Sequence, residues 1–146
     1  MGRILVIEDN RDNLELMIYL LEAFGHETIS ALDGEAGVEA AHRERPDLIV
    51  CDIQMPRLDG FGVARQLKSE PALRNIPLVA VTALAMVGDR EKVLAGRFDG
   101  YIPKPIAPET FVSQLEAYLA PALRTRTRPA SQPSEPGPAR TPGSTA

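Results

Sequence analysis

Four charged side chains, each placed where a short apolar run ends, are the candidates for chemistry in this sequence: Glu8, Asp9, Asp52 and Lys104. If the apolar runs are strands of a parallel sheet, their carboxyl ends lie along one edge, where ligands bind in such sheets. The four charges would then meet in one pocket. Carboxylates that share a pocket repel each other, and a hard divalent cation with oxygen ligands relieves that repulsion. The spacing therefore predicts a site for a divalent cation.

Asp52 begins a segment that reads as a loop. Pro56 fixes one backbone angle, and the turn signal Asp59-Gly60 leads into a helical pattern. At the sheet edge Asp52 is a candidate metal ligand, a candidate nucleophile, or both, and the backbone carbonyl of Gln54 could point back toward the cation. A carboxylate held beside a cation and facing solvent suits a phosphoryl acceptor, because the cation neutralises charge on both acceptor and donor.

Two more strand ends add groups to the same edge. The hydroxyl of Thr82 could donate to a phosphoryl oxygen, and Ala83 is small enough for its N–H to approach the same group. Lys104 supplies a positive point charge, and its bond to Pro105 can be cis at small cost. Tyr101 is expected near the sheet edge on the opposite strand face from Lys104, where its ring could move between inward and outward positions.

The elements that must position these groups alternate along the chain. The patterns predict strands at about 3–8, 27–31, 47–52, 77–82 and 99–103, and helices at about 11–25, 34–45, 60–70, 86–96 and 108–123. Such alternation indicates an α/β fold with a parallel sheet covered on both faces. The simplest solution is a flavodoxin-like, doubly wound, five-stranded sheet in the order 2-1-3-4-5, with five helices. The more polar strand at 27–31 suits an edge of that sheet.

Composition narrows the class of protein. The chain has 146 residues and a formal net charge of -4, which gives no basic footprint for nucleic acid. We find no apolar run of the roughly 20 residues that span a bilayer, so no membrane association is expected. The one cysteine, Cys51, excludes an internal disulfide and fits a cytoplasmic location; we expect it to be inert in the core. His26 and His42 lie away from the acidic edge and are expected at the surface.

A change in composition near residue 124 divides the chain. Residues 125–146 contain five prolines and no Leu, Ile, Val, Phe, Tyr or Met. Such a segment cannot bury enough apolar surface to offset the entropy of ordering it. We therefore expect one folded domain at 1–124 and a disordered Pro/Ser/Thr/Arg-rich tail at 125–146.

Taken together, these segments resemble the receiver domain of two-component response regulators. The resemblance rests on Ile7–Asn10, Asp47–Pro56, Asp59–Gly60, Val81–Ala83 and Lys104–Pro105, and on spacings of 30 residues from Asp52 to Thr82 and 22 from Thr82 to Lys104. It covers residues 3 to about 122. The stretch 83–91 looks most like the stand-alone receivers of the cell-cycle and phytochrome-partner type.

The resemblance implies a phosphorylatable signalling switch that is not otherwise an enzyme. Asp52 matches the aspartate that receives phosphate from a histidine kinase or phosphotransfer protein. The Mg²⁺ ligands would be Glu8, Asp9, Asp52 and the carbonyl of Gln54. Of the acid pair Glu8 and Asp9, Asp9 is the one expected to bind the ion directly. Thr82 and Lys104 match the residues that hold the phosphoryl group, and Tyr101 matches the aromatic switch. The face formed by helix 4, strand 5 and helix 5 would then signal to a downstream protein, and slow autodephosphorylation would reset the state.

Two positions depart from the family pattern. Arg97 stands where the family often has glycine, so either the preceding helix ends one residue early or Arg97 adopts a costly left-handed conformation. Ala107 stands where a capping Asp or Ser would help the last helix. Both departures concern the expected output face and leave the acidic edge intact.

Other functions were weighed against this one. An adaptor of the same fold that binds partners without phosphorylation is the main alternative, although all the expected chemical residues are present. Phosphohydrolases with an aspartyl nucleophile commonly carry an acid two residues later, where this chain has Gln54, which cannot act as an acid or base. A homodimer through helix 4, strand 5 and helix 5, or through an extended helix 5, stays open.

Overall fold

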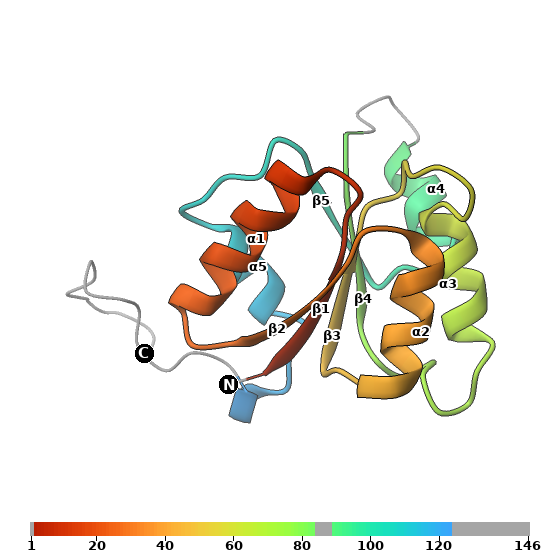
Figure 1. Cartoon of the computed structure of the whole chain (residues 1–146), viewed down its shortest axis with the longest axis horizontal. Coiled ribbons are helices and arrows are strands. Elements are labelled where there is room, and N and C mark those ends of the chain that lie inside the picture. Colours follow the sequence, from red (N-terminus) through yellow and green to blue (C-terminus); the bar gives the residue numbers. More distant parts are fainter. Residues whose placement is uncertain (1, 84–88, 124–146) are drawn as a thin grey trace.

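The computed structural model describes residues 2–83 and 89–123 (Figure 1). The expected tail at 125–146 and the expected start of a helix at 86 lie outside these residues. In chain order the elements are β1 (Arg3–Ile7), α1 (Arg11–Ala23), β2 (Glu27–Ala31), α2 (Gly34–Glu44), β3 (Leu48–Cys51), α3 (Gly60–Lys68), β4 (Leu78–Thr82), α4 (Asp89–Ala95), β5 (Gly100–Pro103), α5 (Phe111–Glu116) and the 3₁₀ turn η1 (Pro121–Leu123).

The five strands form one parallel sheet in the order β2-β1-β3-β4-β5, which confirms the predicted topology. The central strands β1, β3 and β4 are buried on both faces, as their continuous apolar sequences require. Strand β2, the more polar one, lies at an edge. The order reverses between β1 and β3, so the crevice expected for a ligand lies at the ends of these two strands.

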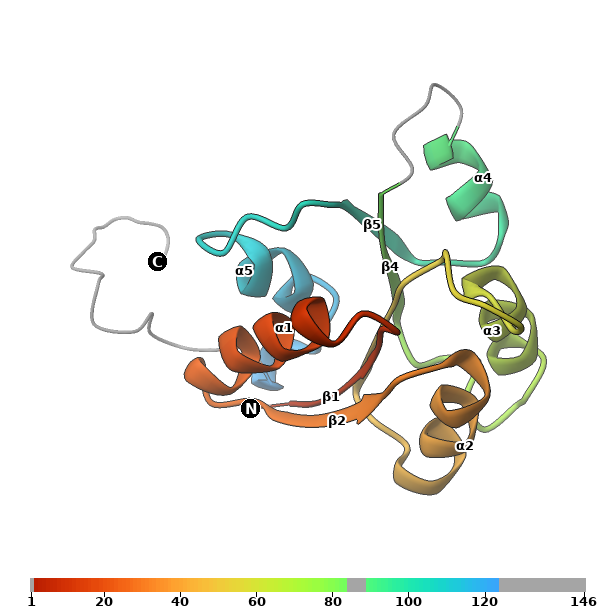
Figure 2. The same cartoon turned by 45° about the horizontal axis from the view of Figure 1, so that its top comes forward.

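Helices cover both faces of the sheet (Figures 1 and 2). Helices α1 and α5 pack on one face, and α2, α3 and α4 pack on the other. Alternation along β1 separates the two cores, because Ile4 and Val6 belong to the cluster under α1 and α5, while Leu5 and Ile7 belong to the opposite cluster. Burial on both faces fixes the strand register, and the register fixes which residues end each strand.

Polar side chains start the helices that flank the crevice. Asn10, Asp33 and Asp59 are the N-caps of α1, α2 and α3, and each accepts a hydrogen bond from the backbone N–H three residues later. Helix α1 ends near Gly25, as its sequence predicts, and Gly25 has φ 90°, a conformation that costs glycine little. These caps set where each loop at the sheet edge meets its helix.

Helix α5 is shorter than predicted. The apolar spacing indicated a helix over 108–123, but α5 spans only Phe111–Glu116 and a separate 3₁₀ turn follows at Pro121–Leu123. Proline has no N–H to donate and disfavours a helical conformation in the residue before it, which explains the interruption. At the other end, the Ala107 carbonyl accepts the N–H groups of Thr110 and Phe111, and the Thr110 side chain makes no capping bond.

Both of the alternatives predicted at Arg97 occur: the helix before it ends early, and Arg97 is in the left-handed conformation. Helix α4 ends at Ala95, and Arg97 itself has φ 77°, in the left-handed region. A side chain with a Cβ atom pays a steric penalty there that glycine avoids. The connection from α4 to β5 is therefore made at a conformational cost.

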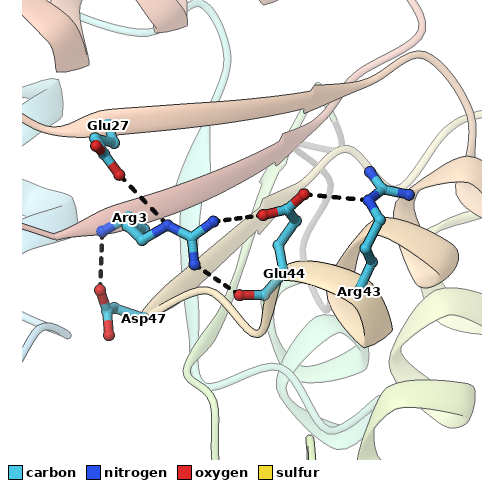
Figure 3. Close-up of polar contacts among 5 residues, drawn as sticks. All are labelled: Arg3, Glu27, Arg43, Glu44 and Asp47. Atoms are coloured by element: carbon cyan, nitrogen blue, oxygen red, sulfur yellow. Dashed lines mark hydrogen bonds and ion pairs between the residues drawn. The ribbon is translucent and has the colours of Figure 1, made fainter.

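The edge of the sheet where the strands begin is tied together by a group that we call the amino edge: Arg3, Glu27, Arg43, Glu44 and Asp47 (Figure 3). The Arg3 guanidinium bonds the Glu44 carbonyl at 2.7 Å and the Glu44 carboxylate at 2.5 Å. The Arg3 N–H donates to Asp47 Oδ2 at 2.8 Å. One arginine thus joins the start of β1 to the end of α2 and to the loop before β3.

His26 corrects a sequence-based expectation. It was expected at the surface, but its side chain is wholly buried beside this edge. Its Nδ1 accepts the N–H of Gly2 at 3.0 Å, and its Nε2 lies 2.6 Å from Glu116 Oε2. Its polar partners, Gly2 and Glu116, are far from it in the sequence, so local sequence gives no sign of them. His42 is exposed, as expected.

Within residues 2–83 and 89–123, we find no helix that combines the length and the apolar character needed to cross a bilayer.

Candidate functional site

Backbone pairing carries three of the predicted site residues to the same edge of the sheet. Glu8 N–H donates to the Ala31 carbonyl at 3.0 Å, and Asp52 N–H donates to the Ile7 carbonyl at 2.9 Å. Each ladder therefore extends one residue beyond its strand. Lys104 is placed in the same way, because its N–H donates to the Thr82 carbonyl at 2.8 Å. The regular end of a parallel sheet is thus what positions these side chains.

We call the group Glu8, Asp9, Asp52 and Lys104 the carboxyl edge. One carboxylate oxygen from each of the three acids lies within 4.8 Å of the others. Lys104 Nζ lies 3.1 Å from Asp52 Oδ2 and 2.8 Å from Glu8 Oε1. The four charges that the sequence analysis singled out therefore converge in one site, as predicted.

Burial differs among the three acids. The Glu8 side chain is fully buried and Asp52 is nearly so, whereas Asp9 is exposed. Glu8 Oε2 accepts the N–H of Asn10 at 3.2 Å. Its other oxygen, Oε1, pairs with the Lys104 ammonium at 2.8 Å. The site thus combines a buried acid with one that is open to solvent.

The electrostatics follow from this burial. Burial and the negative charge of Asp52 raise the pKa of Glu8 to about 7, against the lowering effect of Lys104. Burial alone would lower the pKa of Lys104, but its ion pair with Glu8 and the charge of Asp52 outweigh burial and raise it. Lys104 therefore stays protonated, while Glu8 loses its proton near neutral pH. The site holds more negative charge than one lysine balances.

The donor set of the carboxyl edge fits a hard divalent cation. Three carboxylates within reach of one another are the ligands that Mg²⁺ prefers. The shared lysine is a second indication, because Lys104 pairs with both Glu8 and Asp52, and one positive charge does not balance two carboxylates. Gln54 lies in the same loop, and its N–H donates to Asp52 Oδ1 at 3.2 Å, which orients that carboxylate.

Thr82 and Tyr101, the other two predicted residues, lie on the strands β4 and β5. Thr82 is fully buried at the end of β4. Tyr101 is half-buried on β5 and packs against the cluster under α2, α3 and α4, on the opposite strand face from Ile102. A hollow of about 350 Å³ opens beside the site, and Met17, Ala83 and Lys104 are among its lining residues. The Lys104–Pro105 bond is cis.

Sequence reasoning missed one residue that supports the site. Asn10 caps α1 with its side chain and holds Glu8 with its backbone N–H. The signal was present, since Asn directly after an acidic pair and before a helical pattern indicates a cap. Cys51 is fully buried as expected, and burial, together with the nearby Asp52 charge, raises the pKa of its thiol well above the usual value.

The chain is similar in sequence to known proteins. A family model for the response regulator receiver domain matches residues 4–116. The polar-differentiation response regulators DivK of Brucella anthropi and Brucella ovis are 42% and 41% identical to the chain over 119 residues, which cover 82% of this chain and 97% of each relative.

Solved structures agree with the fold. The receiver domain of a sensor histidine kinase from Pseudomonas aeruginosa, solved with a magnesium ion in its active site cleft, has a TM-score of 0.74 and 32% identity, covering 80% of this chain and 96% of that one. The chemotaxis protein CheY4 of Vibrio cholerae has a TM-score of 0.77 and 24% identity, covering 82% and 99%, and supports the fold alone. With the family match over most of the folded residues, the chain belongs to the response regulator receiver domain family.

Proposed function

We propose that this receiver is a phosphoacceptor that takes phosphate onto Asp52 from a histidine kinase or a phosphotransfer protein. The observation that carries the proposal is the convergence of three carboxylates and Lys104 at the carboxyl edge. The likeness to response regulators, which act in two-component signalling, supports it. Because Asp52 directly follows the buried strand β3, its carboxylate is held in position to attack a phosphoryl group.

In the proposed step, an Asp52 oxygen attacks the phosphorus of a phosphohistidine. The new O–P bond forms as the P–N bond breaks, and the electron pair returns to the imidazole nitrogen. The Gln54 N–H and the Lys104 ammonium hold the two Asp52 oxygens. Lys104 also places a fixed positive charge where negative charge gathers on the transferring group. No general base is needed, since a carboxylate is already the nucleophile.

Mg²⁺ is the proposed cofactor. Asp9 is the most accessible ligand, with Asp52, the carbonyl of Gln54 and the buried Glu8 completing the set. When bound, the ion would neutralise charge on both acceptor and donor. The magnesium in the related Pseudomonas aeruginosa receiver supports this assignment.

The switch is proposed to run from Thr82 to the surface formed by α4, β5 and α5. Thr82 would bond the phosphoryl group, and Tyr101 would turn inward as that surface changes to contact a downstream protein. Slow self-hydrolysis would end the signal, so the chain is a switch and not an enzyme acting on separate substrates. We place this activity in the cytoplasm, where histidine kinases present their phosphoryl groups.

Acetyl phosphate with Mg²⁺ tests the proposal without a known kinase. We expect intact-mass measurements to show one phosphoryl group on the wild type and none on Asp52→Asn, with both proteins folded by circular dichroism. Asp47→Asn, an acid at the amino edge, is the matched control and should be modified like the wild type. An unmodified wild type would favour the adaptor, and modification of Asp52→Asn would refute the acceptor assignment. Transfer from candidate histidine kinases then identifies the donor.

A further inference from the structure

The loop over residues 52–59 carries both Asp52 and Gln54 from β3 to α3. Its side chains Ile53 and Met55 are buried in the core under α2, α3 and α4. Its backbone, however, is contacted closely at both ends by two buried glycines from two different helices. Gly60 begins α3, and Gly34 begins α2.

Gly60 lies against the beginning of the loop. Its N–H donates to the Ile53 carbonyl at 2.9 Å. A Cβ atom at Gly60 would lie 2.6 Å from Ile53 Cα and 2.7 Å from the Asp52 carbonyl oxygen. Both neighbours are backbone atoms, so no side-chain rotation could relieve the clash. The same Asp52 carbonyl also accepts the Cys51 thiol at 3.2 Å, which leaves it little freedom to move.

Gly34 lies against the end of the loop. A Cβ atom there would meet the Leu58 carbonyl oxygen well inside van der Waals contact. The adjacent Asp33 reaches the same loop, because its Oδ2 pairs with the exposed Arg57 guanidinium at 3.4 Å. Arg57 itself has φ 64°, so the loop turns sharply where α2 touches it. The start of α2 therefore limits how far the loop can swing outward.

Other glycines in the described residues make contacts of a different kind. A Cβ atom at Gly62 would meet Cδ1 of the Leu58 side chain, and one at Gly100 would meet the Tyr118 ring. Side chains of this sort can move aside, whereas a backbone carbonyl moves only with its loop. Gly34 and Gly60 thus share a property that Gly62 and Gly100 lack.

We propose that Gly34 and Gly60 are positioning residues of the phosphoryl-transfer site, which act by fixing the backbone of the 52–59 loop from two sides. The inference rests on the proposed function, since it concerns the placement of Asp52 and Gln54. A Cβ atom at Gly60 pushes directly on the Asp52 carbonyl, and one at Gly34 pushes the loop from its far end. Either push moves the Asp52 carboxylate relative to Lys104 and the Gln54 carbonyl relative to the acid pair.

The expected effects are on chemistry more than on folding. Misplacement of a reacting group by about 1 Å can cost about a hundredfold in rate, so Gly60→Ala is expected to slow phosphorylation by acetyl phosphate about tenfold to a hundredfold. Gly34→Ala acts at a distance, and about a tenfold loss is expected. The loss should fall on the maximal rate and on Mg²⁺ affinity together, because Asp52 serves both.

The experiment compares Gly34→Ala and Gly60→Ala with the matched controls Gly62→Ala and Gly100→Ala. Urea unfolding gives stability, amide chemical shifts of residues 52–54 report loop displacement, and titration of those shifts with Mg²⁺ gives affinity. Acetyl phosphate kinetics give the maximal rate and the half-saturating concentration. We expect both control variants to lose stability at most, with the Mg²⁺ affinity and maximal rate of the wild type.

Two results would overturn the inference. Folded Gly34→Ala and Gly60→Ala with wild-type Mg²⁺ affinity and unshifted amides would show that the contacts do not position the loop. Loss of fold in both, with both controls folded, would assign them a purely structural role. If the wild type itself is not phosphorylated, the proposed function fails, while the amide shifts and Mg²⁺ titrations still decide whether the glycines hold the loop.

Discussion

The two edges of the sheet hold their carboxylates in opposite ways. At the amino edge, Arg43 and Arg3 lower the pKa of Glu44. At the carboxyl edge, burial raises the pKa of Glu8 to about 7. The amino edge sets two arginines against three acids, whereas the carboxyl edge sets one lysine, paired with Glu8 and Asp52, against three acids. The difference indicates that one edge is built to hold the fold and that the other retains excess negative charge for a ligand.

Removing an acid from each edge should give the largest contrast. Loss of a group that supports a metal ligand costs about 10–100-fold in affinity, and loss of a ligand's own charge should reach about a hundredfold. We therefore expect Asp9→Asn to weaken Mg²⁺ binding to that extent, measured by calorimetric titration. Asp47→Asn at the amino edge should bind Mg²⁺ like the wild type, and an equal loss in both variants would erase the distinction between the edges.

Removing the central cation of the amino edge should have the reverse effect. Arg3→Met keeps much of the aliphatic length but loses the bonds to Glu44 and Glu27. Because the Arg3 side chain is 40% exposed, we expect the free energy of unfolding to fall by only about 1–2 kcal/mol. Urea denaturation measures the loss. Phosphorylation by acetyl phosphate should proceed at the wild-type rate, and a slower rate would mean that the two edges are coupled.

The raised pKa of Glu8 predicts a pH dependence. Between the ordinary glutamate pKa of 4.5 and about 7, the folded protein binds more protons at Glu8 than the unfolded chain, so stability without Mg²⁺ falls as pH rises through this window. The cost is fully present above about pH 7. Glu8→Gln should therefore be more stable than the wild type at pH 8, by on the order of 1 kcal/mol, and equal to it near pH 4. Thermal unfolding at the two pH values decides this, and a variant that is less stable at pH 8 would contradict it.

The smallest effect is expected at Arg97, a strained position between α4 and β5. Glycine avoids the steric cost at φ 77° but loses more entropy on folding, so Arg97→Gly should raise the free energy of unfolding by about 0.5–1 kcal/mol. Chemical denaturation would detect the gain. Ser69→Gly, at the αR end of α3, is the control and should give no gain. Phosphorylation should be unaffected, since Arg97 lies at the end of the sheet opposite Asp52.

Sequence alone was sufficient for the sheet order and for the convergence of the carboxyl edge. Both follow from local patterns and from one rule, that the ends of parallel strands share an edge. The end of α1 near Gly25 and the strained backbone at Arg97 could also be predicted, because each depends on the backbone preference of one residue. The roles proposed for Thr82 and Tyr101 are predictions that only phosphorylation can test.

The rest depended on contacts between distant segments. His26 and Glu116 are 90 residues apart, and Arg3 and Asp47 are 44 apart, so no local pattern announces either pair. The last helix was predicted too long because its apolar spacing was given more weight than Pro121, which interrupts it. The full burial of Glu8 arises only when the neighbouring strands and Lys104 close around it.

The buried thiol of Cys51 can report on transient opening of the protein core. Its side chain is inaccessible in the closed state, and its raised pKa keeps the reactive thiolate scarce. An alkylating reagent should therefore modify it only when the centre of the sheet transiently comes apart. Since Cys51 directly precedes Asp52, labelling rates measured with and without Mg²⁺ or acetyl phosphate would reveal how strongly each tightens the interior, without adding any probe.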